Sequence, residues 1–208
     1  MNESPEPATI PARPVRGRHG AVASPHHLAT QAGLLVLRTG GSAGDAAIAT
    51  NAALAVVAGH SCGLGGDAVW IIWDADHGEA VTLNGSGSAG SAATIEAALA
   101  AGHSTMPERG AWSVTVPGAV DSWGRAHERF GRLDWTFLLA PAIDLASGFP
   151  ASGAWMEAVE RSAEIFGETG DWASVYRPDD RPRRPGDLVR LPALEGTLGR
   201  LYAEGPSA

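Results

Sequence analysis

A serine between two glycines, Gly85-Ser86-Gly87, is the first candidate for chemistry in this sequence. A nucleophile elbow needs the pattern G-x-S-x-G where a strand turns sharply into a helix, and neither the spacing nor the expected elements fit here. Polar loops that follow a hairpin do, however, often hold substrate groups. Most polar loops of this kind are only connectors, so the residues by themselves leave a substrate-binding role for Asn84, Gly85 and Ser86 open.

The single cysteine, Cys62, lies two residues after His60 and could act as a thiolate that a neighbouring imidazole activates. Catalytic Cys and His usually come from distant positions in a sequence, and an isolated cysteine is often simply buried. The pattern favours a structural cysteine and leaves a Cys62-dependent hydrolase as an open alternative. One cysteine also excludes an intramolecular disulfide.

Neither a metal site nor a nucleotide site is expected, so we predict that no cofactor is bound. His26 and His27 are adjacent, whereas zinc ligands follow spacings such as H-x₃₋₅-H or C-x₂₋₄-C. The glycine-rich run 63–66 follows a predicted helix and precedes a predicted strand. This order is the reverse of the strand, loop and helix that cradle a phosphate.

Composition limits the possible partners of the chain. The 208 residues carry a formal net charge of −8, and all 15 basic residues are arginines, so no basic surface for nucleic acid or an anionic membrane is expected. No stretch of about 18 apolar residues predicts a transmembrane helix. Residues 1–16 are rich in proline and lack the apolar core of a secretory signal, which predicts a flexible N-terminal arm and a cytoplasmic protein.

The elements that position the candidate loop begin with two helices. Apolar residues at helical spacing from Leu28 predict a helix that ends at Gly40-Gly41. Ser42 and Asp45 resemble a capping box for a second helix that extends to Val57. This second helix is apolar on nearly every face, so we expect it to be buried inside a layered structure.

Strands and further helices follow. Residues 68–73 and 80–83 predict a hairpin, and its composition suggests burial on both faces; residues 113–116 predict another strand. Helices are predicted at 95–101, 119–130, 135–147, 153–166 and 193–203, the last with Pro192 in its first turn. Residues 177–186 contain three prolines and four arginines and are predicted to be an exposed connector.

Several segments, taken in order, resemble the γ-glutamyltranspeptidases and their acylase relatives. The resemblance extends from about Arg18 to the C-terminus, and the order of its segments is more specific than any one of them. The segments are GAVASPH at 20–26, LRTGGSAGDAA at 37–47, HSCGLGG at 60–66, VPGAV at 116–120, GRLDW at 131–135 and LPAL at 191–194.

The resemblance implies an α+β fold that is part of a four-layer αββα sandwich of the N-terminal-nucleophile hydrolase type. In this family a precursor cleaves itself and exposes a threonine, whose own amine serves as the base. That threonine begins the smaller, C-terminal subunit in a Thr-Thr-His-like setting, which these 208 residues lack. The resemblance therefore implies that residues 17–208 are the N-terminal portion of a large subunit, that they contain no catalytic residue, and that a C-terminal small-subunit half is the partner.

The resemblance also bears on the substrate. Enzymes of the main branch grip the substrate α-carboxylate with an arginine in the loop after the hairpin, and Ser86 stands at that position here. The pattern Asn84-Gly85-Ser86 is similar to the divergent, acylase-like branch, and the resemblance implies that Asn84, Gly85 and Ser86 form a substrate-binding loop. We expect a small-molecule amide substrate, of which γ-glutamyl compounds such as glutathione are the usual family example. The alternative is a truncated, non-catalytic fragment that needs a partner half or only binds a ligand.

Overall fold

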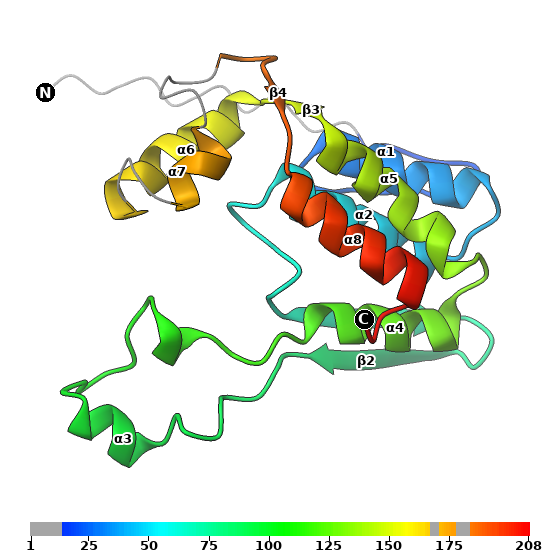
Figure 1. Cartoon of the computed structure of the whole chain (residues 1–208). Coiled ribbons are helices and arrows are strands. Elements are labelled where there is room, and N and C mark those ends of the chain that lie inside the picture. The colour runs from blue at the N-terminus through cyan, green and yellow to red at the C-terminus, as the bar shows by residue number, and fades with distance from the viewer. Residues whose placement is uncertain (1–13, 167–170, 178–183) are drawn as a thin grey trace, which may run out of the picture.

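Helix α2 (Ala43–Val57) lies at the centre of the structure, a computed structural model that describes residues 14–166, 171–177 and 184–208. Helices α1 (His27–Arg38), α4 (Ala119–Phe130) and α5 (Trp135–Ser147) pack around it, and α8 (Pro192–Glu204) packs on α5. The antiparallel hairpin of β1 (Ala68–Asp74) and β2 (Glu79–Gly85) lies along α4 (Figure 1). The helices thus form one layer, and the hairpin covers part of one side of it.

The capping box predicted at the start of α2 is present in full. The Ser42 hydroxyl accepts a hydrogen bond from the Asp45 N–H at 3.0 Å, and the Asp45 carboxylate accepts one from the Ser42 N–H at 2.9 Å. Most residues of α2 are buried, and many of them are alanines. Small side chains let neighbouring helices approach closely, which is why α2 can be surrounded.

Gly33 lies where α1 packs closely against α2. A Cβ atom at Gly33 would lie 3.1 Å from the Ala46 carbonyl oxygen and would also overlap the Thr50 hydroxyl. The side chain of Val22 covers the same position from outside, at 3.1 Å. The segment 20–24 is therefore held against the outer side of these two helices.

The hairpin contacts the helices through one face only. Trp70 donates a hydrogen bond from its indole N–H to the buried Ser122 hydroxyl of α4, at 2.9 Å. On the opposite face Val69, Ile71 and Trp73 are 75%, 81% and 67% exposed. The expectation that both faces are buried is therefore wrong for the part of the chain that the structure describes, because only one helical layer covers the hairpin.

The remaining predicted helices are confirmed to within two residues at either end. They are α3 (Ile95–Ala100), α4, α5, α6 (Gly153–Phe166) and α8, and the Thr94 hydroxyl caps α3 as predicted. The short strands β3 (Phe149–Pro150) and β4 (Leu188–Val189) pair with each other, and α7 (Asp171–Tyr176) packs near α6; the sequence pattern did not indicate these three elements.

The strand predicted at 113–116 is absent, and that prediction is wrong. Residues Ala111–Ser113 form a short 3₁₀ turn, and Val116 makes a single backbone hydrogen bond, to the Ser88 carbonyl at 2.9 Å. Because no strand of the described residues pairs with this segment, its β-branched residues form no ladder there. The segment 1–13 of the predicted N-terminal arm and residues 178–183 of the predicted connector lie outside the described residues. Among the described helices, none is long and apolar enough to cross a membrane.

Replacing Gly33 by alanine tests the helix packing. We expect Gly33→Ala to lower the free energy of unfolding by about 1–3 kcal/mol, because the added methyl group must push α1 away from α2. Gly196→Ala is the matched control, since Gly196 is also helical but its Cβ position is open, and we expect a gain of up to about 1 kcal/mol. Urea unfolding of both variants measures the difference; equal effects would contradict the packing argument.

Candidate functional site

The predicted substrate-binding loop lies at the end of β2, where Gly85 pairs with Ala68 of β1. The side chain of Asn84 accepts a hydrogen bond from the Ser86 N–H at 2.9 Å, which turns the chain sharply away from the strand. Asn84 and Ser86 are exposed, whereas Gly85 is buried. The two polar side chains are thus presented to solvent on a turn that the hairpin fixes in place.

Gly85 is buried because the loop lies directly against the first turn of α4. A Cβ atom at Gly85 would lie 2.7 Å from the Ala68 carbonyl oxygen and would overlap the Ser122 side chain. A Cβ atom at Gly118 would in turn lie 3.0 Å from the Gly87 nitrogen. Two glycines therefore allow backbone to approach backbone, and the role of Gly85 is to place its neighbours rather than to contact a ligand through a side chain.

Asp67 holds the loop from the other side, and the sequence interpretation missed this residue. One oxygen of its carboxylate, Oδ1, accepts a hydrogen bond from the Gly87 N–H at 3.1 Å and another from the Thr115 hydroxyl at 3.3 Å. These donors lie 20 and 48 residues further along the chain. The only signal in the sequence was an acidic residue directly after the glycine run.

The glycine run itself anchors α4. The Gly66 carbonyl accepts hydrogen bonds from the N–H groups of Gly118 and Ala119, at 3.1 and 2.9 Å. A carbonyl oxygen thus occupies the position at this helix start where an anion would bind in a phosphate loop. The arrangement supports the sequence interpretation that this run does not cradle a phosphate.

The environment of Cys62 disfavours a reactive thiolate. Burial raises the pKa of the Cys62 thiol, and its sulfur lies 3.8 Å from the Ala58 carbonyl oxygen. Burial and the nearby Arg161 charge lower the pKa of His60. Both groups are therefore neutral near pH 7, whereas a Cys–His nucleophile requires a thiolate.

His26 caps α1. Its Nδ1 accepts a hydrogen bond from the Leu28 N–H at 3.3 Å, and its ring stacks on His27 with centroids 4.7 Å apart. Burial, and next the nearby His27 and His60, lower the pKa of His26 and keep it neutral. Among the residues that the structure describes, no group of three or more His, Cys, Asp or Glu side chains is placed to hold a metal ion.

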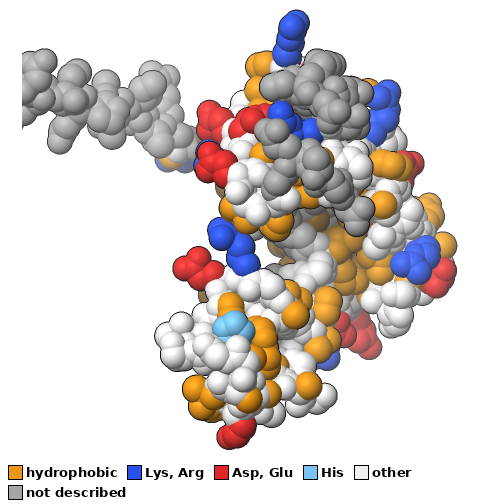
Figure 2. Space-filling view, turned by 60° about the vertical axis from the view of Figure 1, so that its left-hand side comes forward, with side chains coloured by type: hydrophobic (Ala, Val, Ile, Leu, Met, Phe, Trp, Pro, Cys, Tyr) orange, Lys and Arg blue, Asp and Glu red, His pale blue; other side chains and the backbone are white. Residues whose placement is uncertain are grey.

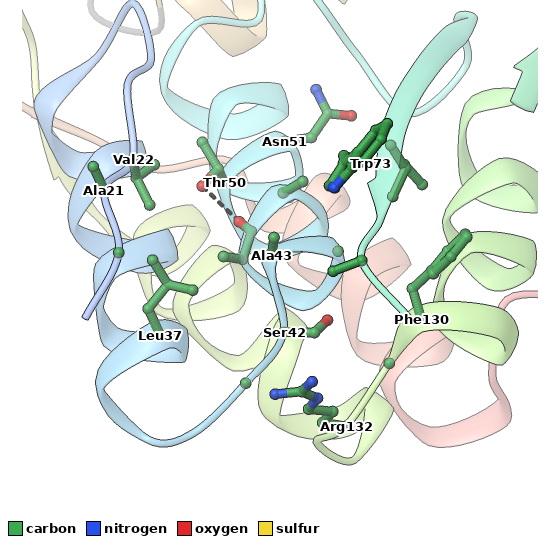
Figure 3. A pocket seen from close by; sticks show the side chains of 18 of the residues that line it. Ala21, Val22, Leu37, Ser42, Ala43, Thr50, Asn51, Trp73, Phe130 and Arg132 are labelled. Carbon is green, nitrogen blue, oxygen red and sulfur yellow. Dashed lines mark hydrogen bonds between the residues drawn. The ribbon is translucent and has the colours of Figure 1, made fainter. Parts of the chain in front are cut away.

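A hollow of about 950 Å³ separates the segment 20–24 from strand β1. Figure 3 shows Val22 and Leu37 on one side of it and Trp73 and Phe130 on the other, with Thr50 of α2 at its floor. The loop residues Asn84, Gly85 and Ser86 do not line this hollow. The predicted binding loop and this hollow are therefore separate features.

Polar groups gather at one end of the hollow, around the hairpin turn. Burial favours a higher pKa for Asp74, but hydrogen bonds from the ring and backbone of His77 and from the Asp76 N–H outweigh it and keep the pKa below its usual value. Arg129 of α4 lies 3.7 Å from the same carboxylate. These contacts tie the hairpin turn to α4.

Two solved structures define the class of protein. Cephalosporin acylase from Bacillus halodurans matches 100% of this chain at a TM-score of 0.86 with 34% identity, and the match covers 40% of that chain. Helicobacter pylori γ-glutamyltranspeptidase matches 92% of this chain at a TM-score of 0.85 with 30% identity, and the match covers 56% of that chain. The chain thus has an α+β fold that forms part of the αββα sandwich of N-terminal-nucleophile hydrolases, as predicted.

The family follows from sequence similarity. The profile described as Gamma-glutamyltranspeptidase matches residues 29–208, and the chain belongs to this family. The glutathione hydrolase-like YwrD proenzyme of Bacillus subtilis is 38% identical over 196 residues. The oxamate amidohydrolase proenzyme of Klebsiella pneumoniae is 39% identical over 194 residues.

The chain spans little more than a third of these curated relatives. The two matches cover 93% and 90% of this chain but only 37% and 36% of the relatives. Both relatives are named proenzymes. The similarity therefore places this chain against one part of a longer family protein.

Replacing Asp67 tests whether it holds the binding loop. In Asp67→Ala we expect the Gly87 amide to exchange its hydrogen about five- to tenfold faster, because its acceptor is lost. Asp67→Asn keeps the Oδ1 acceptor and should exchange as the wild type does. NMR-detected hydrogen exchange measures the rate, with Asp76→Ala at the other end of the hairpin as control. An unchanged rate in Asp67→Ala would show that the contact does not hold the loop.

Proposed function

We propose that this chain is the N-terminal part of a γ-glutamyltransferase-like amide hydrolase or acyl transferase, whose threonine nucleophile belongs to a complementary C-terminal half. In that reaction the threonine hydroxyl adds to the amide carbonyl, the amine leaves after taking up a proton, and water or an acceptor amine releases the acyl group. The chain contributes the helical layer and the Asn84–Ser86 loop. The observation that carries the proposal is the uncovered apolar face of the hairpin.

That face has the composition of a buried surface. Val69, Ile71 and Trp73 lie side by side on β1, and all three are more than 60% exposed. Three large apolar side chains in one exposed row are typical of a surface that another protein segment covers. A second sheet packed face to face on this hairpin would bury them, as in a sandwich.

The hollow beside β1 also supports a complementary half that packs on this chain. Among the described residues β1 pairs only with β2, so its other edge offers free N–H and C=O groups. Across the hollow, residues 21–24 alternate between exposed and half-buried as a strand does, and they also lack a strand partner in the described structure. Unpaired strand edges are normally covered or paired. Strands of the complementary half would fill the space between these two edges.

The binding loop favours a substrate that does not depend on an ion pair at Ser86. The Ser86 hydroxyl is neutral and exposed, and no salt bridge is formed within the loop. Relatives named oxamate amidohydrolase and acylase, beside others named glutathione hydrolase, support an amide substrate. The cytoplasmic location expected from the sequence stays a prediction.

Processing of the assembled protein tests the proposal. The reading frame after the codon for Ala208, or an adjacent gene that encodes the complementary half, is expressed together with this chain. Intact mass spectrometry should show a cleavage directly before a threonine, and the product should hydrolyse amides. Replacing that threonine by alanine is the control and should abolish both. An uncleaved, inactive assembly would support the alternative, a non-catalytic ligand-binding remnant.

Installing the missing arginine tests the role of the loop. We expect Ser86→Arg in the assembled enzyme to raise kcat/KM for a γ-glutamyl amide about 10- to 100-fold, because a charged hydrogen bond to the α-carboxylate contributes about 1.5–3 kcal/mol. Ser147→Arg adds the same charge at an exposed site at the end of α5, away from the loop, and should give no gain. Equal kcat/KM values for the two variants would place the substrate carboxylate away from Ser86.

A further inference from the structure

The segment between residues 88 and 116, here called the 88–116 loop, leaves the body of the protein directly after the binding loop. Figure 1 shows it protruding from the ends of β2 and α4, with α3 near its tip. No residue of α3 is buried. An excursion of this length with so little regular structure is uncommon in a compact domain and is usually functional.

The surface of the 88–116 loop is apolar and poor in charge. Only Glu96, Glu108 and Arg109 carry a charge among its 29 residues. The 88–116 loop forms the lower part of the molecule in Figure 2, and hydrophobic side chains gather on it. Five large apolar side chains are more than half exposed, namely Ile95 at 75%, Leu99 at 60%, Met106 at 62%, Val114 at 63% and Val116 at 53%. Exposed apolar residues with few charges are typical of the centre of a protein interface.

The 88–116 loop is held in a definite shape. At its base the Val116 N–H donates to the Ser88 carbonyl, and Thr115 donates to Asp67. Further out, His103 and Trp112 meet edge to face with ring centroids 5.8 Å apart. The loop thus presents its apolar residues on a preformed surface, which lowers the entropy lost when a partner binds.

We propose that the 88–116 loop is a docking element that packs on the complementary half of the enzyme. This inference rests on the proposed function. The loop starts at the end of the hairpin where Ala68 pairs with Gly85, next to the exposed Val69. A partner that covers the open face of the hairpin therefore reaches the base of the loop, and the relatives, of which this chain matches 36–37%, contain enough additional polypeptide to do so.

This docking has a consequence for the binding loop. Asn84–Ser86 is attached to the hairpin on one side and, through Asp67, to the base of the 88–116 loop on the other. When the complementary half packs on both surfaces, the binding loop lies at the junction of the two halves. Asn84 and Ser86 then face the half that supplies the nucleophile.

A charge placed in the docking surface tests the inference. We expect Leu99→Glu to weaken binding of the complementary half by tenfold or more, because a carboxylate would have to be desolvated in an apolar contact. The melting temperature of the chain alone should not change, since Leu99 is 60% exposed and no residue of α3 is buried. Leu35→Glu on α1, also about half exposed, is the matched control and should bind as the wild type does. Biolayer interferometry with the purified complementary half measures both affinities.

Photo-crosslinking separates the possible outcomes. A benzophenone amino acid at Leu99 should crosslink to the complementary half, as should one at Ile71 on the hairpin. Crosslinking from Ile71 alone, with normal binding of Leu99→Glu, would overturn the docking inference and leave the proposed function standing. Crosslinking from Leu99 to a second copy of this chain would also overturn it. A complementary half that does not bind the wild-type chain would overturn the proposed function itself.

Discussion

The fully buried carboxylate of Asp45 joins parts of the chain that are far apart in sequence. Its Oδ2 atom accepts hydrogen bonds from the N–H groups of Ser42, Arg132 and Leu133, at 2.9, 2.9 and 3.2 Å. The first donor lies at the start of α2, and the other two lie in the turn between α4 and α5. A buried carboxylate is costly unless such donors surround it, so the three elements must meet at this point.

The remaining architecture depends on that junction. With α2 and α4 fixed relative to each other, the Trp123 indole on α4 can donate to the Asn51 side chain on α2, at 2.9 Å. The neighbouring residue of α4, Ser122, carries the hairpin by accepting a hydrogen bond from Trp70. The binding loop is placed by this chain of contacts, so its position depends on a helix junction that it does not touch.

Part of the candidate site could be predicted from the sequence and part could not. The hairpin and the turn after it follow from strand patterns and turn residues, and the family resemblance drew attention to Asn84–Ser86. Asp67 could not be found in this way. Its importance comes from the Gly87 N–H and the Thr115 hydroxyl, and no local pattern indicates that residues 20 and 48 positions away will return to it.

Local signals by themselves determined most of the helices. The Ser42–Asp45 capping box, the Thr94 cap and Pro192 at the start of α8 act within a single turn, so the sequence is sufficient to predict them. Only the tertiary structure decided which faces are covered. The residues of β1 are apolar on both sides, yet one side packs on α4 and the other is open. The burial of each strand face depends on which segments, distant in the sequence, pack against it. The composition of the strand itself does not specify those segments.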